Sequence, residues 1–88
     1  MQKLSKIVPL SKLQAGDKGI VVRIGGHGLT RRRLLDMGVV KNTEIEVIRT
    51  APLGDPIEFT LKGYNLTLRK AEANNVYVSV ANQIGGEA

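Results

Sequence analysis

The sequence predicts an all-β domain that contains one short helix. Apolar and polar residues alternate in several short segments, which is the period of a half-buried strand. Glycine, proline and asparagine separate these segments at short intervals. The 88 residues include one Phe, two Tyr and no Trp, so the core must be mainly aliphatic, and the abundant Val and Ile favour strands.

The chain length predicts one domain with a modest core, because a short chain buries a smaller share of its surface than a long one. We expect residues 1–8 to be an N-terminal lead-in, residues 9–80 to form the domain, and residues 81–88 to be a flexible tail. The first apolar run is short and is broken by Pro9, unlike a signal peptide, and no segment is long enough to cross a bilayer.

The first two segments predict an edge of the core followed by a strand. Four apolar residues at intervals of three are expected to lie over a core edge, with no helix longer than one turn: Leu4, Ile7, Leu10 and Leu13. The first barrel strand is expected from Lys18 to Ile24. In it, Ile20, Val22 and Ile24 share one face and alternate with Val21 and Arg23, so that the second face is partly covered.

A single helix is predicted after this strand. Gly25, Gly26 and Gly28 interrupt the strand pattern. Thr30 can cap the free amides of a helix over residues 31–37, and Gly38 supplies a left-handed stop. Because so short a helix is unstable alone, it must dock on the sheet. The docking side chains are expected to be Leu34, Leu35 and Met37.

The remaining segments complete an antiparallel barrel. Residues 43–50 read as a strand with Ile45 and Val47 facing inward, and Asn42 before it is suited to a positive φ. A hairpin turning at Lys62-Gly63 follows, with Phe59 on its inward face, then a single 3₁₀ turn over residues 71–75 and a last strand over residues 76–80. Five short strands and one helix predict a small, partly open, five-stranded SH3-like barrel.

The residue inventory argues against an enzyme. The chain has no cysteine, which excludes disulfides, thiolate metal sites and a thiol nucleophile. Its one histidine, His27, lies between glycines in a turn, where an exposed side chain is the commoner case. Neither a Ser-His-Asp arrangement nor a phosphate-binding loop with its lysine is visible. We therefore predict that the protein is not an enzyme.

A tight metal site is not expected either. Ferrous iron favours imidazole and carboxylate ligands, and a facial triad needs two histidines where this chain has one. His27 and Asp36 are the candidate ligands, for a weak, solvent-filled site. We predict no tightly bound cofactor, and weak binding of Fe²⁺ or another divalent metal at most.

Charge and loop composition indicate a protein-contact surface. The net charge of +5 and a pI near 9.9 give a surface that attracts nucleic acid, acidic protein or anionic lipid, although such an excess also serves solubility. The densest positive charge is Arg31, Arg32 and Arg33, where the helix dipole gives no reason for cations. Two prolines stiffen the loop of residues 51–56, which lowers the entropy cost of docking. Its candidate contact residues are Leu53, Gly54 and Asp55.

Nucleic acid is the rival partner, because small barrels of this class also bind RNA or DNA. The aromatic residues that single-strand binders use for stacking are nearly absent, and Glu44, Glu46 and Glu58 add negative charge to neighbouring strands. The same shortage of aromatics argues against recognition of proline-rich peptides. We expect a folded protein as the partner, with a nucleic-acid-binding small barrel as the alternative.

Three blocks of the sequence, in this order and spacing, resemble the FeoA family. They are residues 26–38 (GHGLTRRRLLDMG), residues 51–56 (APLGDP) and residues 63–70 (GYNLTLRK), and the resemblance runs from Pro9 to Val80. The pair Lys41-Asn42 stands where this family usually has a Pro-Gly turn. The resemblance implies an SH3-like FeoA domain and a non-enzymatic, regulatory role in bacterial ferrous-iron uptake.

The partner that the resemblance implies is a FeoB-type membrane transporter with a cytosolic G domain. The implied location is the cytoplasm, with a peripheral position at the inner face of the plasma membrane through that partner. A free-standing relative of the SH3-like domain of metal-dependent repressors would have the same fold, but the sequence contains no helix-turn-helix reader. The exposed edges of an open barrel could also pair with a second copy of the chain.

Overall fold

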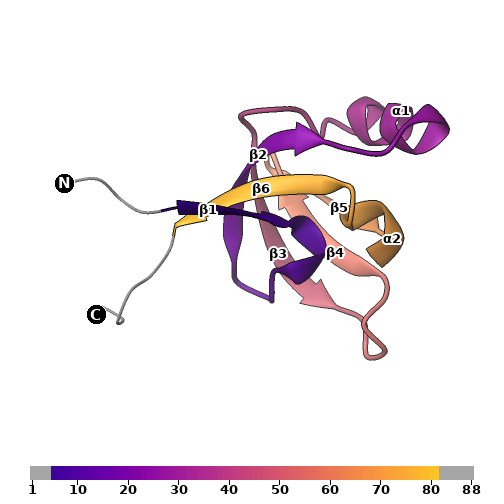
Figure 1. The fold of residues 1–88 in the computed structure, drawn as a ribbon. Helices are drawn as coiled ribbons and strands as arrows, with labels where there is room; N and C mark the ends of the chain where they lie inside the picture. The colour runs from indigo at the N-terminus through magenta and orange to yellow at the C-terminus, as the bar shows by residue number, and fades with distance from the viewer. Residues whose placement is uncertain (1–4, 82–88) are drawn as a thin grey trace.

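The computed structural model describes residues 5–81 and shows six antiparallel strands curled into a small barrel (Figure 1). The strand order is β1-β6-β2-β3-β4-β5. The strands are β1 Ser5–Pro9, β2 Lys18–Ile24, β3 Glu44–Thr50, β4 Ile57–Leu61, β5 Tyr64–Leu68 and β6 Val76–Ala81. The helices are η1 Leu10–Lys12, α1 Gly28–Asp36 and α2 Lys70–Ala73. The predicted tail lies, from residue 82 onward, outside the described residues.

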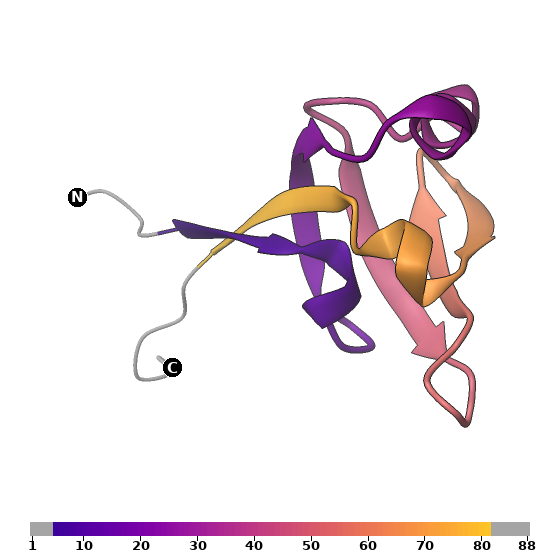
Figure 2. The same cartoon turned by 45° about the vertical axis from the view of Figure 1, so that its right-hand side comes forward.

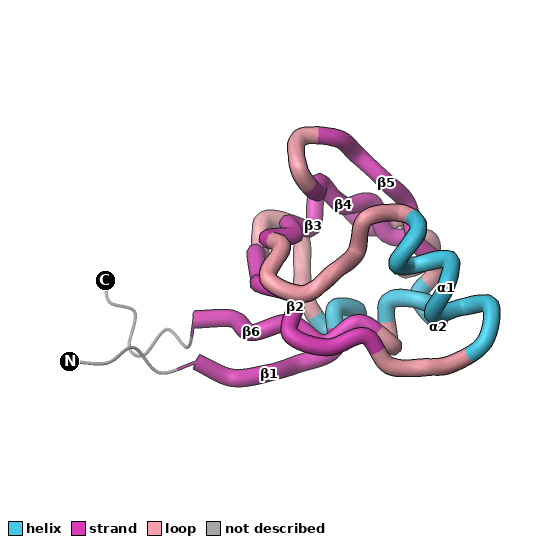
Figure 3. The backbone as a smooth tube through the Cα atoms, turned by 90° about the horizontal axis from the view of Figure 1, so that it is seen from above, coloured by secondary structure: helices cyan, strands magenta, loops and turns pink. Residues whose placement is uncertain are grey.

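The sheet curls without closing. β1 and β5 stand at its two edges and do not pair with each other in the described part of the chain. Seen from above, the sheet turns around a central core while α1 and α2 lie on the same side of the molecule (Figure 3). The predicted fold class, an all-β SH3-like open barrel with one helix between its first strands, is confirmed.

The structure contains one strand more than predicted. β1 pairs with β6, so that Lys6 lies opposite Val80 and Val8 lies opposite Val78. Because side chains alternate across a strand, Val8 turns inward and Ile7 outward, where it is 62% exposed. The expectation that Ile7 covers the core is therefore wrong. The expectation holds for Leu10, which is buried, and Leu13, which is half-buried, while Leu4 lies outside the described residues.

A β-bulge changes which residues of β2 face the core. The pairing of β2 with β6 shifts between Val21 and Arg23. The extra residue lets Val21 and Ile24, three positions apart, both turn inward, while Ile20 is 39% exposed. The predicted alternation over Ile20, Val22 and Ile24 is therefore wrong in β2, because strict alternation assumes an unbroken ladder.

The core is mainly aliphatic and draws side chains from β2 to β6 and from the helices. Phe59 is fully buried, as predicted, and the hairpin turns at Lys62 (φ 50°) and Gly63 (φ 86°), which is the backbone that two-residue hairpins prefer. Asn42 has the expected positive φ of 69°. The other fully buried large side chains are Leu10, Leu34, Ile45, Leu61, Leu68, Val21, Val39, Val47, Val76 and Val78.

The helices differ from the prediction at their starts. α1 begins at Gly28 with His27 as its N-cap, so Thr30 lies inside the helix and does not cap it. Gly26 (φ 72°) and Gly28 (φ 64°) complete the change of chain direction before residue 30, which explains the earlier start. The helix ends before Gly38 (φ 95°), as predicted. Residues 70–73 form one turn of α-helix, α2, where a 3₁₀ turn was expected.

Candidate functional site

The residues predicted to contact a partner lie at two opposite ends of the barrel. α1 carries the three arginines at one end, and the loop of residues 51–56 projects from the other end, beyond β3 and β4 (Figures 1 and 2). The structure therefore brings Arg31, Arg32 and Arg33 together on one helix but separates them from Leu53, Gly54 and Asp55. These are two surfaces, and each is described separately below.

α1 is anchored to the barrel through its last turn. Leu34 is fully buried, and Leu35 and Met37 pack half-buried against the core, as predicted. The Val39 amide donates to the Leu34 carbonyl at 3.1 Å, and the Tyr64 hydroxyl donates to the Met37 carbonyl at 3.2 Å. The C-terminal half of the helix is therefore held in place, while its first turn projects into solvent.

Glu72 ties α1 to α2. One of its carboxylate oxygens accepts the Arg69 amide at 2.9 Å, and the other pairs with the Arg33 guanidinium at 2.9 Å. The Glu72 side chain is only 14% exposed, so its charge is partly shielded from water. Arg33 is therefore an anchor of α1 rather than a free cation. The sequence carried a partial signal for this, since a Glu three residues after a helix N-cap is half of a capping box.

The first five residues of α1 include two free cations and an exposed apolar side chain. In residues 5–81 the ion pairs are Arg33–Glu72 and Arg49–Glu58, which leaves Arg31 and Arg32 without a carboxylate partner. Leu29 is 83% exposed. A shallow hollow of about 480 Å³ lies beside it, lined by Leu29, Arg32, Arg33, Asp36 and Met37.

Sequence reasoning missed Leu29 as a candidate contact. The signal was available, because a leucine in the exposed first turn of a short helix has no core to reach when the docking residues fall in the last turn. Its exposure next to Arg32 gives this end of the molecule the mixed apolar and basic character of many protein interfaces, where arginine is enriched.

The loop of residues 51–56 exposes one leucine on a rigid frame. Leu53 is 95% exposed. The Gly54 amide donates to the Ala51 carbonyl at 2.7 Å, and the Ala51 amide donates to the Pro56 carbonyl at 3.0 Å. Asp55 is turned toward α2, where its carboxylate accepts the Lys70 amide at 2.9 Å. Asp55 therefore fixes the loop, and Leu53 is the side chain that the loop offers to a partner.

The predicted metal ligands do not converge. His27 is exposed at the start of α1, and Asp36 is exposed at its end. A helical rise of 1.5 Å per residue puts their backbones about 13 Å apart, too far for one ion. In the described range 5–81, no group of three or more His, Cys, Asp or Glu side chains is arranged to hold a metal ion. The same residues include no helix long and apolar enough to span a membrane.

Comparison with known proteins identifies relatives over most of the chain. The model of the FeoA domain matches residues 8–80. A protein of Porphyromonas gingivalis described as an Fe(2+) transport protein A/Fe(2+) transporter FeoB fusion protein is 39% identical over 71 residues, which are 81% of this chain. The chain spans only 8% of the length of that fusion protein.

Solved structures share the fold. The NMR structure of a FeoA-like protein from Clostridium acetobutylicum is 37% identical, with a TM-score of 0.82 over 99% of this chain and 98% of the other. FeoA of Stenotrophomonas maltophilia, described as a prokaryotic SH3 domain protein and solved with zinc, is 27% identical, with a TM-score of 0.70 over 78% of this chain and 86% of the other. A manganese-dependent transcriptional repressor, 20% identical, shares the fold alone.

Proposed function

We propose, from the premise that this chain belongs to the FeoA domain family, that it is a non-enzymatic accessory protein of bacterial ferrous-iron uptake. Its partner is a FeoB-type membrane transporter, and it docks on the cytosolic G-domain region of that transporter through the first turn of α1. The loop around Leu53 makes a second, separate contact. This function places the protein in the cytoplasm, at the inner face of the membrane that holds the transporter.

The observation that carries this proposal is the exposed trio of Leu29, Arg31 and Arg32. A leucine that is 83% exposed contributes nothing to the core, and removing it from water against a partner is favourable. Arg31 and Arg32 are the fourth and fifth of the nine residues of α1, away from its C-terminal carbonyls, so the helix dipole does not stabilise either cation. Both features become favourable against a partner that has an apolar pocket with carboxylates around it.

The fused relative supports the choice of partner. In the Porphyromonas gingivalis protein the homologous segment and the FeoB transporter are one polypeptide. A covalent link raises the effective concentration of two modules that bind each other, and is useful only where their contact geometry permits it. Such a contact needs a complementary surface on the FeoA domain, and the exposed Leu29, Arg31 and Arg32 of α1 are the candidate.

The proposal assigns no resident metal to the domain. His27 and Asp36 stand at opposite ends of α1, so each could contribute only one ligand to an ion. The zinc found with the Stenotrophomonas maltophilia relative belongs to that protein. We expect iron to be the cargo of the transporter and the present chain to act by contact.

Binding to the purified cytosolic region of a FeoB-type transporter tests the docking surface. Replacing Arg31 and Arg32 by Ser should weaken binding about tenfold at low ionic strength and less at physiological ionic strength, because salt screens exposed charges. Leu29→Ser should weaken binding by a similar factor at low and at physiological ionic strength, because apolar burial is little affected by screening. Isothermal titration calorimetry at the two salt concentrations measures both effects.

The matched control removes two cations elsewhere. Lys41→Gln with Lys62→Asn lowers the net charge by the same amount as the arginine variant, at positions outside α1. If this control weakened binding as much as the arginine variant did, net charge rather than α1 would govern association, and the docking surface would be wrong. A loss of RNA binding by the arginine variant, without loss of transporter binding, would favour the nucleic-acid alternative.

A further inference from the structure

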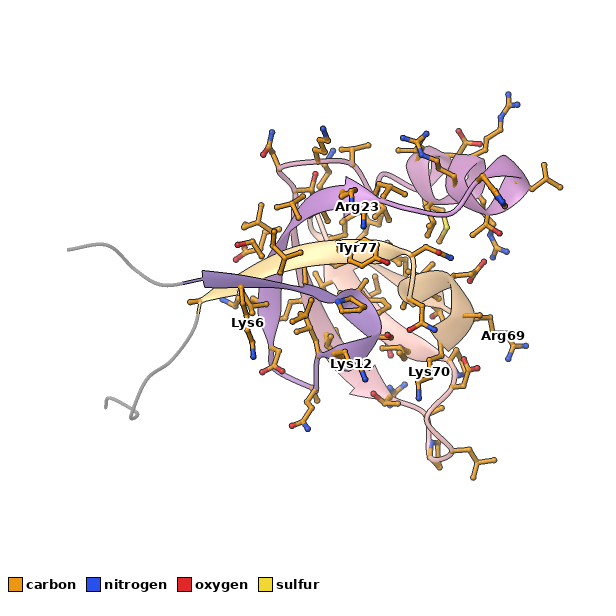
Figure 4. The ribbon with its side chains drawn as sticks, viewed as in Figure 1. Lys6, Lys12, Arg23, Arg69, Lys70 and Tyr77 are labelled. Atoms are coloured by element: carbon orange, nitrogen blue, oxygen red, sulfur yellow. The ribbon has the colours of Figure 1, made fainter. Side chains whose placement is uncertain are left out.

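A second basic surface lies away from α1, in a groove at the end of the barrel where β1 and β6 meet the η1 region. Its volume is about 560 Å³. The groove is lined by Lys6, Val8, Lys12, Leu13, Gly16, Asp17, Lys18, Val80 and Ala81. Figure 4 shows Lys6 on β1 and Lys12 on η1, and both residues line the groove. No residue of α1 takes part, so this surface is independent of the docking surface described above.

The charges of the groove are unbalanced. Three lysines line it against one carboxylate, that of Asp17. One Asp17 oxygen already accepts the Gln14 amide at 2.8 Å, which holds the turn before β2. The ion pairs in residues 5–81 are formed by arginines, so no carboxylate of these residues lies within 4.0 Å of the three ammonium groups.

The floor of the groove is apolar. Val8, Leu13 and Val80 are half-buried and pack against the core while their remaining surface lines the groove. Their positions are rigid, because Val8 and Val80 belong to the paired strands β1 and β6. The groove therefore combines aliphatic surface below with positive charge at the rim.

We propose that this groove binds an acidic peptide segment that carries aliphatic side chains. Carboxylates of such a segment would pair with Lys6, Lys12 and Lys18, and its aliphatic side chains would cover the floor. The segment belongs to a protein partner. This inference does not depend on the docking of α1 on a transporter, because the two surfaces share no residue.

Two other anionic partners fit less well. Single-stranded nucleic acid binds where bases can stack on aromatic rings, and no aromatic residue lines the groove. The aromatic ring on this side of the molecule, that of Tyr77, has one face covered by the Arg23 guanidinium, 4.2 Å from its centroid (Figure 4). A membrane surface cannot follow a concave floor, whereas an extended peptide can enter it and bury Val8 and Val80.

The positive charge continues beyond the groove along one side of the molecule. Ser11 of η1 is hydrogen-bonded to Asn74 after α2, which joins the two elements. Figure 4 shows Lys70 of α2 and Arg69, the N-cap residue before it, beyond Lys12 on this side. The Asp55 carboxylate lies next to Lys70, where it accepts the backbone amide, and moderates the charge there. A longer acidic segment would leave the groove past Lys12 and approach Lys70.

Fluorescence polarisation with a labelled peptide of alternating glutamate and leucine tests the groove in the 88-residue chain. We expect saturable binding that is lost when leucine is replaced by serine or glutamate by lysine. Lys6→Gln with Lys12→Gln should weaken binding about five- to tenfold at low ionic strength. Lys41→Gln with Lys62→Asn removes equal charge outside the groove and should leave the affinity for the peptide within about twofold of that of the parent.

The apolar floor needs a separate test. Val8→Thr nearly keeps the side-chain volume but places a hydroxyl under the aliphatic side chains of the bound peptide. It should therefore weaken binding of the peptide about threefold at any ionic strength. Val22→Thr, at a half-buried position of β2 outside the groove, is the matched control and should leave binding unchanged. Thermal unfolding of each variant checks that the barrel is intact.

Three results would overturn the proposal. The first is equal weakening by the groove lysine variant and by its charge control. The second is a Val8→Thr variant that binds the peptide like the parent, since the floor would then be unused. The third is binding of oligothymidylate or of phosphatidylglycerol vesicles that is tighter than binding of the peptide and that is lost in the Lys6→Gln, Lys12→Gln variant. That outcome would assign the lysines to nucleic acid or to a membrane.

Discussion

The two ends of the molecule both expose a leucine, but they are held in place by different physical means. Leu29 on α1 is 83% exposed, and Leu53 on the loop of residues 51–56 is 95% exposed. α1 is anchored by burial of Leu34 and by the Arg33–Glu72 ion pair. The loop contributes no fully buried side chain and relies on backbone hydrogen bonds and on Asp55.

Both ends are tied to the first turn of α2. The adjacent amides of Arg69 and Lys70 donate to two carboxylates: Glu72, which also holds Arg33 of α1, and Asp55, which belongs to the loop. Each carboxylate satisfies an amide that α2 cannot satisfy internally, since the first amides of a helix have no partner within it. The difference between the ends teaches that α1 depends on the core and on α2, whereas the loop depends on α2 and on its own backbone.

The largest effect is expected from the core, because its loss unfolds the whole barrel and with it both ends. Phe59→Ala should lower the free energy of unfolding by about 3–5 kcal/mol, because it empties the centre of the core on β4. Both ends should then lose structure together. Urea denaturation followed by circular dichroism measures the change. A variant as stable as the parent would mean that Phe59 does not fill the core.

A smaller and more local effect is expected at α1. Leu34→Ala should destabilise the protein by about 2–4 kcal/mol, since it removes the one fully buried side chain of the helix. Amide hydrogen exchange should accelerate first in α1, while the Gly54 amide keeps the protection of the parent. Equal acceleration at both ends would show that α1 is not a separately held element.

Loss of the Asp55 hydrogen bond should destabilise the loop of residues 51–56 without affecting α1. Asp55→Ala should cost about 1 kcal/mol, because it leaves the Lys70 amide without its carboxylate acceptor. Exchange should accelerate at Lys70 and in residues 51–56 and remain unchanged at Leu34. Asp55→Asn keeps an acceptor oxygen and is the control. If both substitutions had the same effect, the charge rather than the hydrogen bond would hold the loop.

The sequence predicted the strands where alternation was unbroken. β4 follows a strict period of two, and Ile45 and Val47 of β3 are buried as predicted, although the pairing of β3 with β4 shifts between Val47 and Arg49. β1 was missed because Pro9 and the spacing of Ile7 and Leu10 indicated a covering segment rather than a strand. The bulge in β2 depends on how that strand pairs with β6, which lies more than fifty residues away in the chain.

The candidate site was predicted in part for the same reason. The arginine run is local and visible, but the roles of its members differ through a contact with Glu72 that no local pattern requires. Asp55 similarly meets Lys70 only in the folded chain. The prediction that the loop of residues 51–56 presents Leu53 at its tip agrees with the structure, in which that side chain is 95% exposed. Sequence reasoning could therefore not assign the contacts between side chains that only the tertiary structure brings together.

The smallest effect on stability, and the most informative one on function, is expected from Leu53→Asp. A residue that is 95% exposed should change the free energy of unfolding by less than about 0.5 kcal/mol. Binding to the cytosolic region of the transporter should nevertheless weaken at every ionic strength, because a charge would replace an apolar contact.

A further prediction concerns the variant that combines Leu53→Asp with the replacement of Arg31 and Arg32 by Ser. Because Leu53 and the arginines of α1 lie at opposite ends of the barrel, Leu53→Asp and the double Arg31, Arg32 to Ser change should add in binding free energy to within about 0.5 kcal/mol. Calorimetric titration of parent, both variants and the combination decides it. A large deviation from additivity would mean that the partner couples the two ends, and an unaffected Leu53→Asp variant would leave α1 as the sole contact.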